Sequence, residues 1–298
     1  MTAQVNQFNK TRIAPTPSGF LHLGNILSFA ITAALARKTG AKILLRIDDL
    51  DRARVNQQYV QDIFDTLNFL EIPWDEGPGN AVEFEESYSQ LHRMALYNNA
   101  LKQLAANKQV YACSCSRQQI TNSGGDISSS CECLNKHIPL ETENVNWRLI
   151  TRNNQEINVK NYDGKIIQAH LPAEMHNFIV KKKDGFPAYQ LTSVIDDLFY
   201  GVDLIIRGDD LWPSTLAQQE LAIALNEDKF GTIAFYHHPL LMEEGKKFSK
   251  SAGATSVRFL RGNGKTPQDI YTLIAGMLGF TQSVGNWELL ADAICIGF

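Results

Sequence analysis

The chain has 298 residues, of which 44% are hydrophobic and 20% are charged, and its formal net charge is −4. This composition is typical of a folded globular protein and excludes a long disordered chain, a collagen-like repeat and a coiled coil. No apolar run reaches the roughly 20 residues that cross a bilayer, and the polar N-terminus lacks the apolar stretch of a signal peptide. We therefore expect a cytoplasmic protein of about two domains that binds neither a membrane nor DNA.

The first third of the chain predicts alternating strands and helices. Arg12–Ala14 is a short strand candidate, and the apolar residues after it recur with helical spacing until Gly40, a typical helix stop. A buried strand is predicted at residues 41–47, because its side chains are apolar almost throughout. Two more helices are predicted at about 55–70 and 87–106. This order predicts an α/β fold with a parallel sheet.

The middle of the chain predicts a smaller, inserted α+β module. Residues 114–136 are rich in Ser, Gly and Cys and contain few large apolar side chains. Residues 147–183 then predict short strands, with a hairpin turn at Lys183-Asp184-Gly185. Such a module has little apolar core of its own.

The α/β pattern resumes after this module. Residues 201–207 predict a strand, and Ser214 is a good N-cap for the helix that follows. Another strand-like run lies within 232–242, and the last thirty or so residues predict helices. The expected divisions are a split catalytic domain at 1–110 and 189–253, an inserted module at 111–188, and a helical C-terminal segment at 254–298.

The loop at residues 15–25, with the sequence PTPSGFLHLGN, places a histidine at the start of a predicted helix. The free N–H groups of a helix N-terminus favour anions, above all phosphate. His22 can donate to a phosphate oxygen there, and Gly24 lets a nucleotide approach the backbone closely. A capped helix with an incidental histidine is the alternative interpretation.

A second candidate loop lies at residues 246–253, with the sequence KKFSKSAG. Its lysines can neutralise a pyrophosphate as negative charge develops, and its serine hydroxyls can add hydrogen bonds. Taken alone, the loop is better explained as a solvated basic segment.

Together, His22-Leu23-Gly24-Asn25 and Lys247-Phe248-Ser249-Lys250-Ser251 resemble, in order and separation, the two signatures of class I aminoacyl-tRNA synthetases. Three further stretches resemble the glutamyl/glutaminyl branch of that family: residues 12–19, 45–51 and 206–211. The resemblance covers about residues 11–253. It implies a Rossmann-type catalytic domain in which glutamate attacks the α-phosphorus of ATP and the acyl group then moves to an RNA hydroxyl. Such catalysis depends on positioning and electrostatic stabilisation rather than on a protein nucleophile.

The resemblance also implies roles for individual residues. His22 and Lys250 are expected to be catalytic. The residues expected to bind ATP, with its Mg²⁺, are His22, Gly24, Asn25, Lys247, Ser249 and Lys250. Those expected to bind L-glutamate are Arg12, Thr16, Asp48, Tyr189 and Arg207. The two arginines suit the carboxylates of the substrate, Asp48 suits its α-ammonium group, and Tyr189 lines the pocket. The alternatives are surface salt bridges and, for Tyr189, core packing.

Some positions depart from the family pattern. Asn25 replaces the second histidine of the first signature, and Phe248 replaces a methionine while keeping an apolar anchor. Asp48 stands where glutamyl enzymes usually carry Glu and glutaminyl enzymes carry Asp. Arg207 stands where glutamyl enzymes place an arginine that glutaminyl enzymes lack. Because a charged partner for the substrate side chain matters more than one methylene, we expect glutamate.

Four of the five cysteines form two CxC pairs, Cys113-Ser114-Cys115 and Cys131-Glu132-Cys133. Four thiolates can hold one structural Zn²⁺ and leave no open coordination position, so we expect zinc here. Four buried or free thiols are the alternative. The site is similar to a zinc module of bacterial glutamyl enzymes, and related stand-alone enzymes often have Tyr four residues before the third cysteine. Ile127 stands there in this chain, so Cys133 must supply the fourth ligand. Cys295 lies alone in the expected terminal helix.

Only 45 residues follow Gly253, too few for the anticodon-binding domain of a full glutamyl synthetase. This resembles the stand-alone paralogues that activate glutamate without tRNA and place it on queuosine at the wobble position of tRNA(Asp). The anticodon loop of tRNA(Asp) would then enter the site, and Lys181–Lys183 would supply positive charge; a solvated hairpin is the alternative.

Two other functions stay open. One is a truncated glutamyl- or glutaminyl-tRNA synthetase that charges a tRNA 3′ end. The other is a non-catalytic paralogue that binds tRNA or an amino acid. The expected partners are ATP, L-glutamate and the anticodon loop of tRNA(Asp), and we expect the protein to be a monomer.

Overall fold

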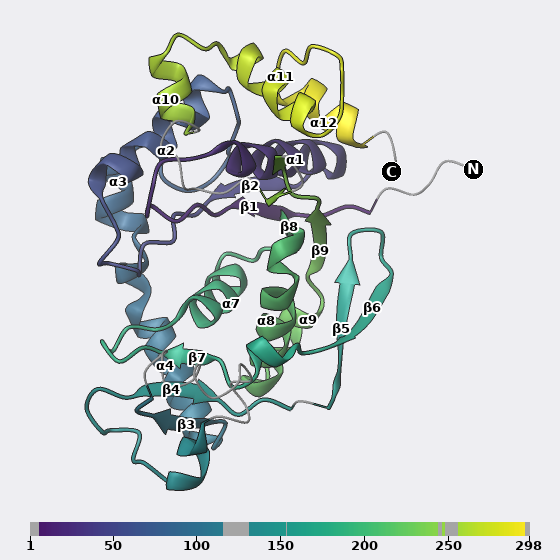
Figure 1. Ribbon diagram of the computed structural model, residues 1–298. Helices are drawn as coiled ribbons and strands as arrows, with labels where there is room; N and C mark the ends of the chain where they lie inside the picture. Colours follow the sequence, from purple (N-terminus) through teal and green to yellow (C-terminus); the bar gives the residue numbers. More distant parts are fainter. Residues whose placement is uncertain (1–5, 116–130, 153, 244–245, 248–255, 296–298) are drawn as a thin grey trace. The chain divides into compact units, whose positions relative to one another are not determined.

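The computed structural model describes residues 6–115, 131–152, 154–243, 246–247 and 256–295. The chain divides into two compact units (Figure 1). The first unit comprises Met1–His92, Val202–Asp210 and Tyr236–Phe298, and the second comprises Arg93–Gly201 and Leu211–Phe235. The expected insertion at 111–188 lies within the second unit.

The first unit begins with a β–α–β arrangement, as predicted. Strand β1 (Lys10–Ile13) pairs in parallel with β2 (Lys42–Leu45), and α1 (Leu23–Thr39) connects them. Both strands are buried from their second residue onward, which explains why they are apolar rather than alternating. The pairing continues past the strands, because the N–H of Asp48 donates to the carbonyl of Pro15 at 2.9 Å.

Helix α1 ends where the sequence predicts. Gly40 adopts a φ of 77°, a left-handed conformation that closes the helix and that glycine adopts without strain. The helix packs against β1, β2 and β8 (Leu204–Gly208), so most of its circumference is buried. Strand β8 lies beside β1, with the N–H of Asp203 donating to the carbonyl of Lys10 at 3.0 Å.

The predicted helix at 87–106 is wrong in its first half. Helix α2 (Gln57–Phe69) and the short α3 (Ala81–Glu83) precede it. A π-helical turn, η1 (Phe84–Tyr88), and a 3₁₀ turn, η2 (Gln90–Arg93), occupy the region before α4 (Met94–Ala106). The buried carboxylate of Asp49 explains the break, because it accepts from the Ser89 hydroxyl at 2.6 Å and from the Gln90 N–H at 2.8 Å. These contacts replace the helical hydrogen bonds at that point.

The remaining elements of the first unit lie near its C-terminus. Strand β9 (Ala234–His238), which neighbours β8 in its sheet, is followed by the antiparallel pair β10 (Met242–Glu243) and β11 (Lys246–Lys247). Three helices follow in the described residues: α10 (Val257–Gly262), α11 (Pro267–Met277) and α12 (Trp287–Cys295). The last two lie in the stretch of about thirty residues for which the periodicity predicts helices. Helices α11 and α12 pack on α1 (Figure 1).

Among its described residues, the second unit contains an antiparallel sheet, a hairpin and four helices. The sheet has the order β3 (Val110–Cys113), β4 (Asn146–Leu149) and β7 (Ile179–Lys181). The hairpin consists of β5 (Glu156–Asn161) and β6 (Ile166–His170), and β5 also pairs in parallel with the first residues of β9. The helices are α4, α7 (Tyr189–Phe199), α8 (Trp212–Ala224) and α9 (Asp228–Gly231), and two 3₁₀ turns are η3 (Glu132–Lys136) and η4 (Ala173–Met175). A third 3₁₀ turn, η5 (Asp209–Leu211), leads into α8.

Ser214 is not an N-cap, contrary to the prediction. Helix α8 begins at Trp212, with Leu211 as its N-cap residue, so Ser214 lies inside the first turn. Pro213 has a fixed φ that suits a helix start, which lets the helix begin earlier. The Ser214 hydroxyl instead accepts a hydrogen bond from Gln190 Nε2 at 3.1 Å, which links α8 to α7.

A buried ion pair fixes α4 against α7 in the second unit. Asp196 is fully buried, and its carboxylate accepts two hydrogen bonds from Arg93, at 2.8 and 3.0 Å, and one from the Tyr97 hydroxyl at 2.7 Å. A bidentate guanidinium with a further donor compensates the cost of burying the charge.

Among the described residues, none of the helices has the length and the apolar character that a membrane span requires.

Candidate functional site

His22 is the N-cap residue of α1. Its Nδ1 accepts from the N–H of Gly24 at 3.1 Å, and its own N–H donates to Asn25 Oδ1 at 3.1 Å, which forms a reciprocal capping box. Because Nδ1 is an acceptor, a neutral ring carries its proton on Nε2. His22 can therefore donate from Nε2 to an anion at the helix N-terminus.

Gly24 makes this cap possible. A Cβ at Gly24 would lie 3.1 Å from both Nδ1 and Cε1 of His22, so a side chain there would press against the ring. The glycine therefore supports the placement of the histidine. Asn25, where the family has a histidine, places its side-chain oxygen in the capping box.

The described segment that begins at Ser256, after the second signature in sequence, pairs with the first signature. Ser256 forms an isolated antiparallel bridge with His22, and the N–H of Val257 donates to the carbonyl of Leu21 at 2.8 Å. Ser256 then caps α10 by accepting from the N–H of Phe259 at 3.2 Å. Two segments more than 200 residues apart in sequence are thus joined backbone to backbone. Lys247 lies in β11, while Ser249 and Lys250 lie outside the described residues.

Arg12 and Arg207 come from neighbouring strands of the first unit. Arg12 lies on β1, is 7% exposed, and donates from Nη1 to the carbonyl of Ile206 at 3.3 Å. Arg207, the next residue along β8, is 3% exposed. Two buried guanidinium groups on adjacent strands create a positive potential that favours an anionic ligand.

Asp48 follows β2 and forms a buried ion pair that sequence reasoning missed. Arg46 Nε donates to Asp48 Oδ1 at 2.7 Å and Arg46 Nη2 donates to Oδ2 at 3.1 Å. A carboxylate has about four lone-pair positions, so this bidentate pair leaves acceptor capacity for an ammonium group. The N–H of Asp48 is bonded to Pro15, which places the exposed Thr16 next to this turn.

Two histidines at the end of β9 also belong to this region, and sequence reasoning missed them. Burial, followed by the charges of Arg207 and His238, lowers the pKa of His237 to about 3, so this ring is neutral at physiological pH. Burial also lowers the pKa of His238, whose Nδ1 is 2.9 Å from the Pro239 carbonyl and whose Nε2 is 2.9 Å from the Ser28 hydroxyl. The second contact ties β9 to α1. The only sequence signal was a pair of histidines inside a strand-like run.

Tyr189 and the cysteines belong to the second unit. Tyr189 is the first residue of α7 and is 45% exposed, so it is not a core residue.

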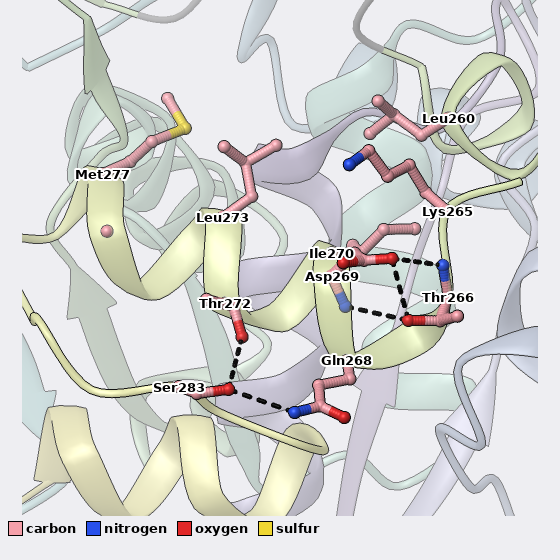
Figure 2. A pocket seen from close by; sticks show the side chains of 11 residues that line it. Leu260, Lys265, Thr266, Gln268, Asp269, Ile270, Thr272, Leu273, Met277 and Ser283 are labelled. Carbon is pink, nitrogen blue, oxygen red and sulfur yellow. Dashed lines mark hydrogen bonds between the residues drawn. The ribbon is translucent and has the colours of Figure 1, made fainter. Parts of the chain in front are cut away.

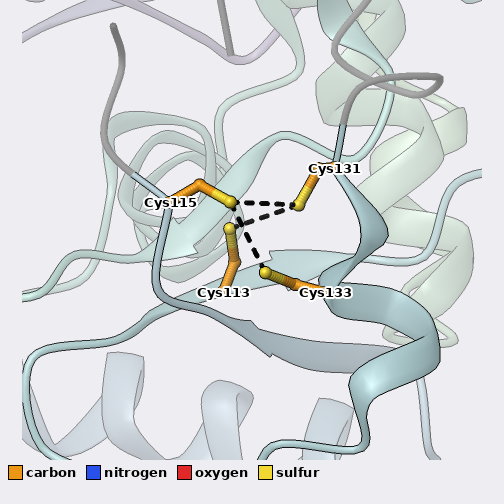
Figure 3. Close-up of side chains that lie close together, drawn as sticks. All are labelled: Cys113, Cys115, Cys131 and Cys133. Atoms are coloured by element: carbon orange, nitrogen blue, oxygen red, sulfur yellow. Dashed lines mark hydrogen bonds between the residues drawn. The ribbon is translucent and has the colours of Figure 1, made fainter. Parts of the chain in front are cut away.

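The four predicted cysteines converge (Figure 3). The Sγ of Cys115 is 3.8 Å from that of Cys131 and 3.5 Å from that of Cys133, and the Sγ atoms of Cys113 and Cys131 are 3.5 Å apart. All four sulfur atoms lie within 4.8 Å of one another. A tetrahedral zinc ion with Zn–S bonds of about 2.3 Å has sulfur–sulfur edges of about 3.8 Å. The donor set therefore fits a metal such as zinc, with Cys133 in the fourth position.

The protonation of these thiols is consistent with a metal site. Burial raises the pKa of Cys115 to about 12 and also raises that of Cys131. Burial also acts to raise the pKa of Cys133, but the N–H of Ser114 and the neighbouring thiols lower it to about 7. A bound cation would supply the positive charge that stabilises all four thiolates together. The cluster packs against Tyr111, which closes it on the side of β3.

The lysine run next to this cluster is already engaged within the second unit. Lys183 Nζ donates to the carbonyl of Ser114, inside the first CxC turn, at 2.8 Å. The Lys181 ammonium lies 4.4 Å from the centre of the Trp147 ring, and Lys182 Nζ is 3.1 Å from an oxygen of Asp184. The run is therefore not a fully solvated hairpin, and its contact with RNA stays a prediction.

A pocket of about 800 Å³ lies on α11 and the turns beside it (Figure 2). Its polar groups are paired with one another: Asp269 accepts from Thr266, and Gln268 Nε2 donates to the Ser283 hydroxyl at 3.1 Å. Leu273, which is 45% exposed, contributes the apolar part of the wall. Because its lining includes no candidate site residue, this pocket is separate from the signatures.

Comparisons with known proteins show the family to which the chain belongs. Residues 9–292 match the family described as tRNA synthetases class I (E and Q), catalytic domain. Two relatives are called glutamyl-Q tRNA(Asp) synthetase. The one from Methylococcus capsulatus is 33% identical over 90% of this chain and 83% of its own length. The one from Symbiobacterium thermophilum is 32% identical over 91% of this chain and 87% of its own length.

A solved structure has the same fold. The glutamate-tRNA synthetase of Elizabethkingia anophelis superposes with a TM-score of 0.73 and 21% identity over 96% of this chain. The chain spans 65% of the length of that protein. Since the family match covers nearly all of the described residues, this chain belongs to the catalytic-domain family of class I glutamyl and glutaminyl tRNA synthetases, and it is a ligase of the aminoacyl-tRNA synthetase type.

Proposed function

We propose that this protein uses ATP to activate L-glutamate as glutamyl-adenylate without tRNA, and then transfers the glutamyl group to queuosine at the wobble position of tRNA(Asp). The observation that carries the proposal is the backbone pairing of Leu21 and His22 with Ser256 and Val257, which connects the first signature to the segment that follows the second signature in sequence. The names of the two relatives that are matched over most of their own length support the choice of product.

Glutamate would bind in the first unit near the carboxyl ends of β1, β2 and β8, where ligands of open α/β sheets commonly bind. Arg207 would pair with the side-chain carboxylate and Arg12 with the other carboxylate, because a guanidinium fork suits a planar carboxylate. Asp48 would accept from the α-ammonium group while Arg46 keeps its carboxylate in place. Thr16 would contribute to the pocket wall, and Tyr189 stays a residue expected to bind glutamate.

In the activation step, a carboxylate oxygen of glutamate forms a bond to the α-phosphorus of ATP. The bond from this phosphorus to the bridging oxygen breaks, and pyrophosphate leaves with the electron pair. His22 would donate from Nε2 to a phosphate oxygen at the N-terminus of α1, near Gly24 and Asn25, where the helix dipole favours an anion. Lys247, Ser249 and Lys250 would stabilise the leaving pyrophosphate, and Mg²⁺ would neutralise part of the phosphate charge.

In the transfer step, a queuosine hydroxyl attacks the glutamyl carbonyl carbon and AMP leaves. The inserted module at 111–188 is proposed to contact the anticodon loop, with Lys181–Lys183 providing positive charge. A structural Zn²⁺ held by the four cysteines would stabilise the fold of this module, because four protein ligands leave no open position for catalysis.

The first test is ATP–pyrophosphate exchange without RNA, with glutamate, glutamine and aspartate in parallel. Exchange with glutamate alone supports the proposal. Exchange with glutamine alone, or exchange that requires tRNA, points to an ordinary synthetase instead. Absence of exchange with all three amino acids, both without RNA and after tRNA is added, contradicts an activating enzyme and favours a non-catalytic paralogue.

The second test follows labelled glutamate onto tRNA(Asp) with and without queuosine. The proposal requires labelling only of the queuosine-containing tRNA. Periodate destroys both the 3′-terminal diol and the queuosine diol, so it is informative only beside the queuosine-free tRNA. Labelling of that tRNA, abolished by periodate, would instead identify a 3′-end-charging enzyme.

A further inference from the structure

One buried carboxylate, Asp62 of α2, lies between the turn that precedes the first signature and helix α10 of the first unit. Asp62 is 1% exposed, and its Oδ2 accepts a hydrogen bond from the N–H of Leu21 at 3.5 Å. Its Oδ1 is 3.6 Å from Arg261 Nη2 on α10. Within the described part of the chain, this Oδ1 has no hydrogen-bond partner, so the charge is only partly compensated.

The peptide group of Leu21 is therefore held from two sides. Its N–H faces Asp62 on α2, and its carbonyl accepts from Val257 at the start of α10 at 2.8 Å. The next residue, His22, forms the bridge with Ser256. The position of the histidine thus depends on the hydrogen bonds that α2 and α10 make with Leu21, the residue before it.

Aromatic contacts of Phe20 also connect this turn to α2 and α10. The Arg258 guanidinium lies 4.5 Å from the centre of the Phe20 ring, and Phe20 packs edge-on against Tyr59 of α2 at 4.8 Å. Arg261 also lies 3.6 Å from Asp65 and 5.7 Å from the centre of the Phe69 ring. Helix α10 thus contacts both the turn at residues 20–22 and α2.

A buried carboxylate with one long hydrogen bond is costly for the fold. Burial is the largest effect on Asp62, and it raises the pKa of this carboxyl. An amide or an apolar side chain would avoid that cost, so the folded state gains little from the charge itself. What the carboxylate does provide is an electrostatic anchor for Arg261 and an acceptor for the N–H of Leu21.

We propose that Asp62 is a positioning residue for the activation step, which keeps α10 docked on the turn at residues 20–22 and so holds His22 in place. This inference rests on the proposed function. It requires that loss of the Asp62 charge weakens the use of ATP, because both signatures are expected to bind ATP. The use of glutamate should change much less, since Arg12 and Arg207 lie on strands that Asp62 does not contact.

The test compares Asp62→Asn with Asp65→Asn in glutamate-dependent ATP–pyrophosphate exchange. Both variants lose a carboxylate that faces Arg261, but the Asp65 side chain is 44% exposed, so screening by water leaves that pair weak. We expect Asp62→Asn to raise the KM for ATP about 10-fold, to change the KM for glutamate less than about twofold, and to leave the melting temperature unchanged or higher. Asp65→Asn should stay within about twofold of the wild type in all three.

A double variant, Asp62→Asn with Arg261→Gln, checks the connection. If the two residues act together, the double variant should have about the same KM for ATP as Asp62→Asn alone. An unchanged KM for ATP in Asp62→Asn overturns the inference, and so does an equal rise in both KM values with a lower melting temperature. Failure of the proposed function gives a different result, because the wild type itself would then show no exchange. If Mg²⁺-ATP also fails to raise the melting temperature of the wild type, the proposed function and the role of Asp62 are both overturned.

Discussion

Replacing Gly24 with alanine should separate the stability of α1 from the placement of His22. The added Cβ would lie 3.1 Å from Nδ1 and Cε1 of His22, which is too close for the ring to stay where it is. The ring must move by a few tenths of an ångström, which weakens the hydrogen bond that it now accepts from the Gly24 N–H at 3.1 Å.

The two energetic effects oppose each other. Loss of an N-cap hydrogen bond costs about 1 kcal/mol of folding free energy, whereas Gly→Ala in a helix gains up to about 1 kcal/mol. The free energy of unfolding should therefore change by less than about 1 kcal/mol. Complete loss of one transition-state donor costs about 10²–10³-fold in kcat, so a displaced His22 should lower glutamate-dependent exchange by at least about 10-fold.

The assay pairs denaturant unfolding with ATP–pyrophosphate exchange. Gly276→Ala in α11 is the matched control, because a Cβ there meets nothing within 4 Å; it should keep full exchange. His22→Asn keeps a good N-cap but removes the imidazole, so it should retain stability and lose about 10²–10³-fold in exchange. Wild-type exchange in Gly24→Ala would refute the argument that the glycine positions the ring.

Three further predictions concern the metal, the substrate pocket and pH. Cys133→Ser should lower zinc from about one ion per chain to below about 0.2, with a lower melting temperature, while Cys295→Ser keeps the metal; full metal content in Cys133→Ser would rule out the four-cysteine site. Arg207→Ala should abolish glutamate activation and Arg207→Lys should restore little of it, since an ammonium cannot make the bidentate contact; normal exchange in the alanine variant would disprove the pocket assignment. His237 stays neutral in the folded protein because its pKa is lowered to about 3, whereas the unfolded chain takes up a proton below about pH 6.5. The free energy of unfolding should therefore fall by about 2 kcal/mol from this residue between about pH 8 and pH 5, and His237→Gln should remove that part of the decrease; an unchanged pH dependence would contradict it.

The sequence alone predicted the features that depend on short stretches of chain. The strand–helix–strand order, the stop of α1 at Gly40 and the convergence of the four cysteines are confirmed by the structure. Each depends on local rules: hydrophobic periodicity, the left-handed conformation that glycine allows, and the preference of metals for thiolates at close spacing. The two signatures also identified the family, because motifs of defined order and separation are specific even when each one alone is weak.

Only the tertiary structure decided the features that depend on residues distant in sequence. Asp49 interrupts the helix predicted at 87–106, because its carboxylate accepts hydrogen bonds from Ser89 and Gln90, about 40 residues away in sequence. The location of Asp62 beside Leu21, and the pairing of His22 with Ser256, could not be predicted from either segment by itself. Burial is the physical reason. A carboxylate or a backbone N–H removed from water must find a partner within the fold, and only the folded chain determines which distant residue supplies it.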